Sequence, residues 1–231
     1  MNRSLAIITA RGGSKRIPRK NIKDFLGFPI IKYSIVAALN AKCFDEVMVS
    51  TDDIEIANIS RQFGAIVPFI RSETNSNDHA GTAEVIREVI TEYERRGECF
   101  DQVCCIYPTA PFIKPEVLAT AMSTLGSTGA DCVLPVVAYS YPIQRSLKIG
   151  NGLVKMIWPE NYSKRSQDLE RVYHDCGQFY CLKTSSLKTQ MKLFCDHTVP
   201  IILNESVVQD IDTEEDWKIA EMKYQISLTE K

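Results

Sequence analysis

Several features that mark other classes of protein are scarce or absent in this sequence of 231 residues. It has only three histidines, so a histidine-based metal site is not expected. No apolar segment approaches the length of a bilayer span, and the run from Leu5 to Ala10 is too short for a secretory leader. There is no low-complexity tract and no obvious internal repeat. The formal net charge is −2, which disfavours a dedicated nucleic-acid binder, because such proteins usually have a basic excess.

The sequence also lacks paired cysteines of the CxxC type, although it contains eight cysteines. Several of them lie inside apolar runs such as "VCCIY" and "ADCVLPV", where cysteine acts as a small hydrophobic residue. We therefore predict reduced, mostly buried thiols. Free thiols are typical of cytoplasmic proteins, so we expect a cytoplasmic location.

Short apolar runs alternate along the chain with longer amphipathic ones, which predicts a Rossmann-like α/β fold with a mostly parallel sheet flanked by helices. Strands are expected near residues 5–10, 45–51, 65–69, 101–107, 130–137, 176–182 and 198–203. Helices are expected over residues 29–41, after a cap at Asp52 or Asp53, and over 81–95, 115–125 and 213–225.

The regular alternation stops after Val137. Residues 138–175 contain several aromatic residues, two prolines and the dipeptide Asn151-Gly152, which is a strong signal for a β-hairpin. We predict that residues 1–231 form a single domain and that residues 138–175 are an arm inserted into it.

The stretch "IITARGGSKRIPRKNIKDF", which begins at Ile7, contains six basic residues beside a Gly-Gly pair. Ligands of open α/β sheets bind at the carboxyl ends of the strands, where this loop is expected to lie. It matches neither GxxxxGK[ST] nor GxGxxG, so P-loop and dinucleotide-binding sites are disfavoured. Glycines that allow close approach, next to several cations, predict a site for a polyphosphate. The alternatives are a solvated basic turn and a patch that binds RNA.

A longer stretch, "IITARGGSKRIPRKNIKDFLGFPII", resembles the N-terminal signature of the acylneuraminate cytidylyltransferases, enzymes that join CTP to 2-keto-3-deoxy sugar acids. Further segments resemble that family in the same order, namely "DEVMVSTDDIEIA", "VPFIR", "YPTAPF" and "DIDTEEDW". The resemblance covers nearly the whole chain. It implies the nucleotidyltransferase form of the α/β fold, release of pyrophosphate from CTP, Mg²⁺ as cofactor and a homodimer.

Within that family, "YPIQRSLK", "KRSQDLE" and "YHDCGQFY" resemble the branch that activates pseudaminic acid, a bacterial nonulosonic acid. Members that activate N-acetylneuraminate have Gln where Tyr107 stands here and Lys near Gln144. The expected product is CMP-pseudaminic acid, used for glycosylation of the bacterial surface or of flagellin. The alternatives are the same reaction on legionaminic or N-acetylneuraminic acid, and a catalytically silent protein that binds nucleotide sugars.

The resemblance also assigns residues to the nucleotide. Those expected to contact it are Arg11, Gly12, Gly13, Ser14, Lys20, Asn21, Arg71, Ala80, Gly81 and Thr82. Arg11 and Lys20 are further expected to act in catalysis by holding the phosphates.

Asp210 and Asp212 are the candidate metal ligands and are also counted as catalytic. Alternating residues of an extended segment point to the same side, so the two carboxylates can share one face. Hard oxygen ligands suit Mg²⁺. The alternative is that Asp212 caps the helix that follows it.

Sugar contacts are expected at the other end of the site. Arg145 and Arg165 in the arm are the candidate partners of the sugar carboxylate, because a guanidinium pairs with carboxylate through two hydrogen bonds. The remaining candidates are Tyr107, Gln144, Gln178, Phe179 and Tyr180. The apolar residues of the arm need a partner surface, which agrees with a homodimer in which each arm reaches across its neighbour. Neither a nucleic acid nor a membrane is expected as a partner.

Overall fold

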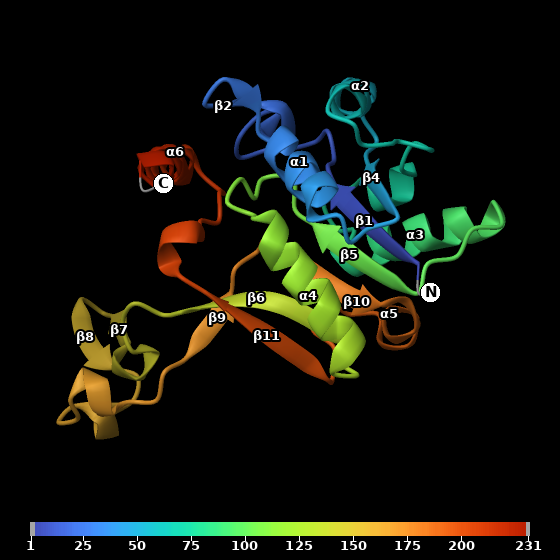
Figure 1. Ribbon diagram of the computed structural model, residues 1–231. Coiled ribbons are helices and arrows are strands. Elements are labelled where there is room, and N and C mark those ends of the chain that lie inside the picture. Colours follow the sequence, from blue (N-terminus) through green and yellow to red (C-terminus); the bar gives the residue numbers. More distant parts are fainter. Residues whose placement is uncertain (1–2, 230–231) are drawn as a thin grey trace.

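The computed structural model describes residues 3–229 and is built around a seven-stranded sheet (Figure 1). Its strands follow the order β11-β6-β10-β5-β1-β4, and β9 pairs with β6. The strands are β1 (Ser4–Thr9), β4 (Glu46–Ser50), β5 (Gln102–Ile106), β6 (Cys132–Ala138), β9 (Tyr173–Asp175), β10 (Phe179–Lys183) and β11 (Thr198–Leu203). Only β9 and β10 run antiparallel to their neighbours. The predicted α/β class with a mostly parallel sheet is confirmed.

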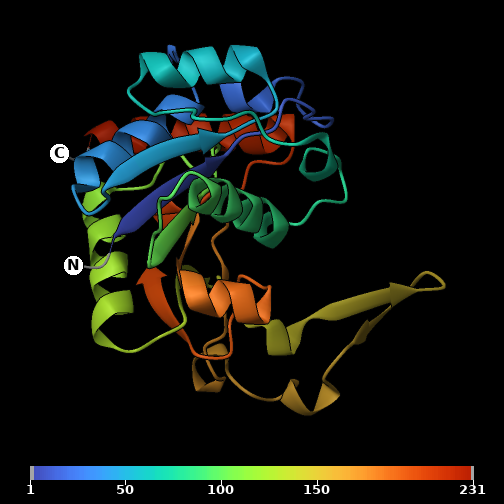
Figure 2. The ribbon, with the colours of Figure 1, turned by 90° about the vertical axis from the view of Figure 1, so that its right-hand side faces the viewer.

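Helices cover both faces of this sheet (Figures 1 and 2). One face packs against α1 (Ile31–Ala41), α2 (Ile54–Gln62) and α4 (Pro115–Ser127), and the other against α3 (Thr82–Arg95) and α5 (Thr184–Gln190). Successive side chains of a strand point to opposite faces, so β1 supplies Ala6 and Ile8 to the first core and Leu5 and Ile7 to the second. All four are fully buried, which explains why this strand is apolar throughout.

The C-terminal helix α6 (Glu214–Thr229) lies outside these layers, beside a small hairpin of β2 (Asp24–Phe25) and β3 (Phe28–Pro29). A third cluster of buried side chains joins them, made of Ile17, Phe25, Ile30, Phe112, Ile211, Trp217 and Ala220. Its aromatic rings meet edge to face, with the centroids of Phe25 and Trp217 5.7 Å apart. This cluster attaches α6 next to the loop that follows β1.

The inserted arm projects away from the body of the molecule (Figure 2). It contains a hairpin of β7 (Leu147–Gly150) and β8 (Leu153–Met156). Asn151 and Gly152 connect the two strands with φ of 51° and 73°, so the predicted hairpin is confirmed. The arm is shorter than expected, because residues 173–175 form β9 and pair with β6 in the main sheet.

Other parts of the fold differ from the predictions. Residues 65–69 form no strand. Ile66 makes one isolated bridge to Met48, and Pro68 has no N–H with which to extend the pairing. Pro29 lies in β3 rather than in the first turn of α1. The hairpin of β2 and β3 and the helix α5 were not predicted. Single 3₁₀ turns span Lys20–Ile22, Glu73–Asn75, Ile143–Arg145, Pro159–Asn161, Ser166–Asp168 and Glu205–Val207.

All eight cysteines are free, as expected, and six of them are buried. Cys104 and Cys181 face each other across β5 and β10 in the core, with their sulfurs 3.3 Å apart. None of the helices between residues 3 and 229 combines the length and the apolar character needed to cross a membrane.

Candidate active site at the carboxyl ends of the strands

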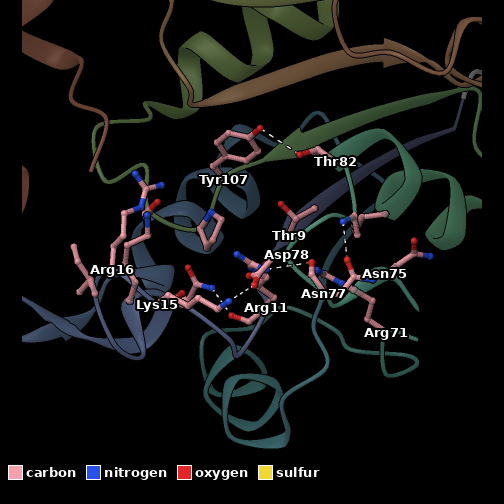
Figure 3. Close-up of a pocket in the computed structure, with 18 residues that line it drawn as sticks. Thr9, Arg11, Lys15, Arg16, Arg71, Asn75, Asn77, Asp78, Thr82 and Tyr107 are labelled. Carbon is pink, nitrogen blue, oxygen red and sulfur yellow. Dashed lines mark hydrogen bonds and ion pairs between the residues drawn. The ribbon is translucent and has the colours of Figure 1, made fainter. Parts of the chain in front are cut away.

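A cleft of about 300 Å³ opens where β1 and β5 end (Figure 3). The loop after β1 forms one side, the segment before α3 a second, and the residues after β5 a third. The lining residues are Thr9, Arg11, Ser14, Lys15, Arg16, Ile17, Lys20, Asn21, Arg71, Asn75, Asn77, Asp78, Ala80, Thr82, Val85, Tyr107, Pro108 and Thr109. The position agrees with the general location of ligands in open α/β sheets.

Gly12 allows the loop to lie directly on the start of α2. Its backbone N–H donates to Asp52 Oδ1 at 2.8 Å, and a Cβ at this position would stand only 2.8 Å from Asp53 Oδ2. Of the two expected caps, Asp53 caps α2 by accepting from the N–H of Ile56 at 3.0 Å. Asp52 instead holds the loop. A side chain at Gly12 would force the loop away from Asp52 and Asp53.

Two further contacts fix the far end of the loop. Arg19 has a left-handed φ of 54° and pairs with Asp53 and Glu55. Buried Asn21 donates from Nδ2 to the carbonyl oxygen of Arg11 at 2.8 Å. The amide nitrogen of Asn21 therefore shapes the loop, and its side-chain oxygen is the atom left for a ligand.

The first pair of loop cations meets an acid from the opposite side of the cleft. Arg11 Nη1 lies 2.8 Å from Asp78 Oδ1, and Lys15 pairs with the other oxygen of the same carboxylate (Figure 3). Arg11 also donates to the carbonyl oxygen of Asn77 at 3.1 Å. The pKa of Asp78 is lowered by its hydrogen bonds to Lys15 and then Arg11. Arg11, which was expected to meet phosphate, thus holds a carboxylate together with Lys15.

The second pair of loop cations meets the segment that precedes α6. Arg16 Nη1 lies 2.8 Å from Asp212 Oδ2, and Lys20 Nζ lies 3.7 Å from Asp212 Oδ1. Lys20 also donates to the carbonyl oxygen of Ile211 at 2.6 Å. Burial lowers the pKa of Lys20, and the charges of Asp212 and Asp210 oppose that shift. The structure therefore brings Lys20 together with both predicted metal ligands.

Asp210 and Asp212 flank Ile211, whose side chain is fully buried in the third cluster. Burial raises the pKa of Asp210, and the neighbouring charge of Asp212 raises it further. Neither acid caps α6. Thr213 and Asp216 form a reciprocal cap, in which Asp216 Oδ2 accepts from the N–H of Thr213 at 2.8 Å and Thr213 Oγ1 accepts from the N–H of Asp216 at 3.2 Å.

The donor set of this acid pair fits a magnesium ion. Burial and repulsion from Asp212 both disfavour the charged form of Asp210, and a bound cation would offset both effects. Among residues 3–229 there is no group of three or more His, Cys, Asp or Glu side chains placed to hold a metal. Two carboxylates are nevertheless sufficient, because Mg²⁺ keeps several waters and takes further oxygens from substrate phosphates.

Arg71 lines the cleft beside Ser50, the last residue of β4, and is 6% exposed. Its Nε donates to Ser50 Oγ at 2.9 Å and its Nη2 to the carbonyl oxygen of Ser50. Burial lowers its pKa, which the more distant charges of Asp52 and Glu88 oppose. Its hydrogen-bond partners are neutral, so the buried guanidinium favours an anionic or strongly polar ligand in the cleft.

The N-terminus of α3 also faces the cleft through Ala80 and Thr82. Gly81 is the N-cap and makes no side-chain cap. Thr82 is therefore free of a capping role, and its hydroxyl lies 3.4 Å from the Tyr107 hydroxyl. Gly13, the remaining predicted nucleotide residue, has open space where a Cβ would lie.

The predicted sugar residues after β9 are less accessible than expected. Gln178 is buried and donates from Nε2 to the carbonyl oxygen of Val207 at 2.8 Å. Phe179 is fully buried in the first core and does not line the cleft. Tyr180 is buried in the second core, and its ring meets the Tyr107 ring edge to face at 5.7 Å. Of all the predicted sugar residues, Tyr107, which follows β5, is the one that lines the cleft.

The predicted sugar residues of the arm do not line the cleft of their own chain. Gln144 donates to the carbonyl oxygen of Glu170 at 2.9 Å, Arg145 donates to Ser166 Oγ at 3.3 Å, and Arg165 pairs with Asp168 at 2.8 Å. Since the arm projects from the body, these side chains can serve only a surface that comes to the arm (Figure 2).

The prediction missed several residues that line the cleft, among them Thr9, Asn75, Asn77 and Asp78. Thr9 could have been predicted from the sequence, because it ends the first strand and ligands of open α/β sheets bind at the carboxyl ends of strands. The segment around Asp78 carried none, because its path is set by distant contacts. Ser72 N donates to Glu88 Oε1 at 2.7 Å, and Asn75 also bonds that carboxylate.

Comparisons with known proteins show to which family this chain is similar. A family model described as cytidylyltransferase matches residues 5–196. The pseudaminic acid cytidylyltransferase of Campylobacter jejuni subsp. jejuni serotype O:2 is 39% identical over 226 residues, which cover 97% of each chain. The CMP-N,N'-diacetyllegionaminic acid synthase of Legionella pneumophila subsp. pneumophila is 34% identical over 229 residues and 95% of each chain.

A solved structure extends the agreement to the fold. The structure of CMP:2-keto-3-deoxy-manno-octonic acid synthetase complexed with CTP superposes with a TM-score of 0.69, covering 98% of this chain and 99% of the other. Identity over that match is 18%, so it bears on the fold alone.

Proposed function

This chain belongs to the cytidylyltransferase family, and from that membership we propose that it condenses CTP with pseudaminic acid to give CMP-pseudaminic acid and pyrophosphate. The product would serve glycosylation of the bacterial surface or of flagellin. Because the reaction consumes CTP, we place it in the cytoplasm.

The observation that supports this function best is the set of four loop cations at one cleft, two of which, Arg16 and Lys20, meet Asp212 of the acid pair. Lys20 joins the loop to the segment of the acid pair, with the carbonyl oxygen of Ile211 at 2.6 Å and Asp212 at 3.7 Å. A nucleoside triphosphate needs cations for its phosphates, and a metal-binding acid pair on the same side suits a phosphoryl transfer. The pseudaminic acid enzyme of Campylobacter jejuni matches along nearly its full length, which favours that sugar.

In the proposed reaction the hydroxyl at the anomeric carbon of the sugar acid attacks the α-phosphorus of CTP. The bond from the α-phosphorus to the bridging oxygen breaks, and pyrophosphate leaves with that oxygen. Arg11 and Lys15 hold the terminal phosphates after exchanging the Asp78 carboxylate for them. Lys20 neutralises charge on the leaving group as a point charge with several donors. Arg71, with the N-terminal residues of α3, contacts the cytidine.

Asp210 and Asp212 would hold Mg²⁺. When bound, such an ion withdraws charge from the α-phosphate and orients it for attack. For that arrangement Arg16 has to leave Asp212, to which it is paired at 2.8 Å, and it then becomes available to phosphate.

The arm supports a homodimer in which it completes the sugar site of the neighbouring subunit. Its hairpin exposes Leu147, Ile149, Leu153 and Val154, each more than half exposed. Arg145 and Arg165 lie on the same arm and are remote from the cleft of their own chain. In the proposed dimer they meet the sugar carboxylate in the partner's cleft, while residues 1–231 act as one domain with the arm as its extension.

A second candidate is the same reaction on legionaminic acid, favoured by the 34% identical Legionella pneumophila synthase. A silent binding protein is disfavoured, because the cations and the acid pair needed for transfer are all present.

Pyrophosphate release is the decisive measurement. The protein is supplied with CTP, Mg²⁺ and, in parallel, pseudaminic, legionaminic and N-acetylneuraminic acid. We expect the highest kcat/KM with pseudaminic acid. A higher value with either other sugar acid overturns the choice of sugar and leaves the reaction class standing. No release with any sugar acid, together with normal CTP binding, overturns the enzymatic proposal.

A further inference from the structure

Asp175 lies at the end of β9, outside the residues that line the cleft, and both of its carboxylate oxygens are engaged. Oδ1 accepts from the N–H of Gly177 at 2.8 Å, and Oδ2 accepts from the Tyr180 hydroxyl. Both hydrogen bonds come from its own chain, so this exposed carboxylate is already oriented by two fixed partners. Each of its two hydrogen bonds leads to the candidate active site.

The first connection runs through two tyrosines. Tyr180 is buried, and its ring packs edge to face against Tyr107 with an interplanar angle of 63°. Tyr107 lines the cleft, and its hydroxyl lies 3.4 Å from Thr82 Oγ1 at the start of α3. Burial raises the pKa of both tyrosines, so both hydroxyls remain protonated and able to donate. The charged acceptor at Asp175 therefore fixes the orientation of Tyr180, against which Tyr107 rests.

The second connection runs through the turn after β9. Gly177 has a φ of 60°, and a Cβ at this position would lie 3.9 Å from Asp210 Cγ. The turn therefore packs beside Asp210. Its conformation depends on the hydrogen bond to Asp175, which joins the two sides of the turn. The Asp175 carboxylate thus supports the pair Tyr107 and Tyr180 through one hydrogen bond and the Gly177 turn, which packs beside Asp210, through the other.

We propose that Asp175 is a positioning residue for the sugar-acid side of the active site. It acts on Tyr107 through Tyr180, and on the segment that contains Asp210 through the Gly177 turn. This inference rests on the proposed function. It assigns to Asp175 no contact with the substrate. Its effect is to keep Tyr107 and the turn beside Asp210 in the positions that receive the sugar acid.

The effect is directed to the sugar acid because Tyr107, the predicted sugar residue that lines the cleft, lies across the cleft from Arg11 and Lys15 (Figure 3). The four loop cations make their contacts with Asp78, Asn77, Ile211 and Asp212, and none with Asp175, Tyr180 or Tyr107. Loss of Asp175 should therefore leave the phosphate contacts intact and weaken the binding of the second substrate.

Three variants separate the two connections. Asp175→Ala removes both hydrogen bonds, Asp175→Asn keeps an acceptor for the N–H of Gly177, and Tyr180→Phe removes only the hydroxyl. Asp131 provides a matched control, because its carboxylate accepts from Ser186 Oγ at 2.6 Å and Gln190 Nε2 at 3.1 Å, away from the cleft. Asp131→Ala therefore loses a comparable set of contacts without touching the site.

We expect the KM for the sugar acid to rise about tenfold in Tyr180→Phe and further in Asp175→Ala, as suits a lost hydrogen bond to a charged group. The Kd for CTP, measured by calorimetry without the sugar, should stay within about twofold. The double variant Asp175→Ala/Tyr180→Phe should be no worse than Asp175→Ala, because the shared hydrogen bond is already gone. Asp131→Ala should lower Tm and leave both substrate constants unchanged.

Two results would overturn the positioning role. One is that the wild type is active and Asp175→Ala has the same KM for the sugar acid and the same Kd for CTP. The other is a loss in Asp175→Ala that Asp131→Ala reproduces at equal Tm. Wild-type protein that turns over no sugar acid is a separate result. It contradicts the proposed function, and the positioning role fails with it.

Discussion

At the scale of single residues, the acid pair offers the sharpest test, because its carboxylates take no part in the cap of α6, to which Asp212 contributes only its backbone N–H. The cap consists of Thr213 and Asp216, whereas Asp210 and Asp212 face Lys20 and Arg16. Substitution of either acid by asparagine preserves size and removes a negative ligand. It should therefore affect a bound cation far more than the fold.

We predict that Asp210→Asn and Asp212→Asn each lower kcat at least about a hundredfold, on the order of 3 kcal/mol of transition-state stabilisation. Tm without ligands should change little, and raising Mg²⁺ should restore part of the activity. The control is Asp216→Asn, which weakens the cap by up to about 1 kcal/mol and should lower Tm while keeping kcat within a few-fold. Near-normal kcat at low Mg²⁺ in both asparagine variants would mean that the pair is structural.

Asp78 offers a second test at this scale. Its carboxylate already occupies the two cations that are proposed to meet the terminal phosphates, so it competes with the ligand. We predict that Asp78→Asn binds inorganic tripolyphosphate about three- to tenfold more tightly at low ionic strength, with a smaller gain at high salt. Calorimetry measures the change. Asp196→Asn, whose partner Lys192 is remote from the cleft, should bind like wild type. Unchanged or weaker binding in Asp78→Asn would contradict the competition.

The sequence was informative about residues whose role follows from a local pattern. The basic loop after an apolar strand and the alternating acids of "DIDT" are two such patterns, and the fold brings Lys20 of the first to Asp212 of the second. Asp78 could not be found in this way, because its segment is shaped by contacts with Glu88 on α3. The burial of Phe179 in the core could not be predicted, because a strand residue that points into the core and one that points into a pocket have the same local pattern.

At the scale of elements, α6 holds the acid pair in place through one aromatic side chain. Trp217 is 3% exposed, packs edge to face on Phe25, and has the Lys23 ammonium 4.7 Å above its ring. Ile211, which separates the two acids, belongs to the same cluster. The position of the acids therefore depends on how tightly the first turns of α6 are packed.

We predict that Trp217→Ala lowers stability by about 3–5 kcal/mol and raises the Mg²⁺ concentration needed for half-maximal activity. Trp217→Phe should show the same direction with a smaller loss. Tyr93→Ala is the matched control, because Tyr93 is equally buried and packs edge to face on Phe69 and Phe100 on the far side of the sheet. It should lower Tm and leave the Mg²⁺ requirement unchanged. An equal change of that requirement in both variants would argue against a specific role of α6.

The elements also show why prediction from sequence reached its limit. The hairpin of the arm was predicted because Asn151-Gly152 suits positive φ. The hairpin of β2 and β3 was missed because Leu26 adopts a φ of 52°, a conformation that leucine rarely takes. The antiparallel direction of β10 follows from the return of the chain after the arm. That is a tertiary feature, and the apolar run of β10 does not encode it.

At the scale of the whole molecule, the arm is the feature that a single chain leaves incomplete. Its hairpin is exposed on both strands, with Ile149 79% exposed and paired in register with Val154. An isolated two-stranded hairpin is at best marginally stable in water, so its apolar side chains require a covering surface.

We predict that the protein is a dimer by light scattering at micromolar concentration and that Ile149→Asp/Val154→Asp shifts it toward monomer. Activity should fall with dissociation and recover at high protein concentration, because the partner's arm supplies part of the site. Ile54→Asp, at an equally exposed residue of α2, should leave the dimer intact. A wild-type monomer with full activity would remove the proposed role of the arm.

The contact of Lys20 with the carbonyl oxygen of Ile211 joins positions 191 residues apart, and Lys23 with Glu214 spans the same interval. Synthesis proceeds from the N-terminus, so a nascent chain presents its basic loop long before the acids that face it have been made. Closing so distant a contact is a late and slow event in folding. On refolding from denaturant, helical signal should therefore return before nucleotide binding. Until the segment around Asp212 has been made, the nascent chain carries the basic loop of the proposed polyphosphate site without the acids that face it.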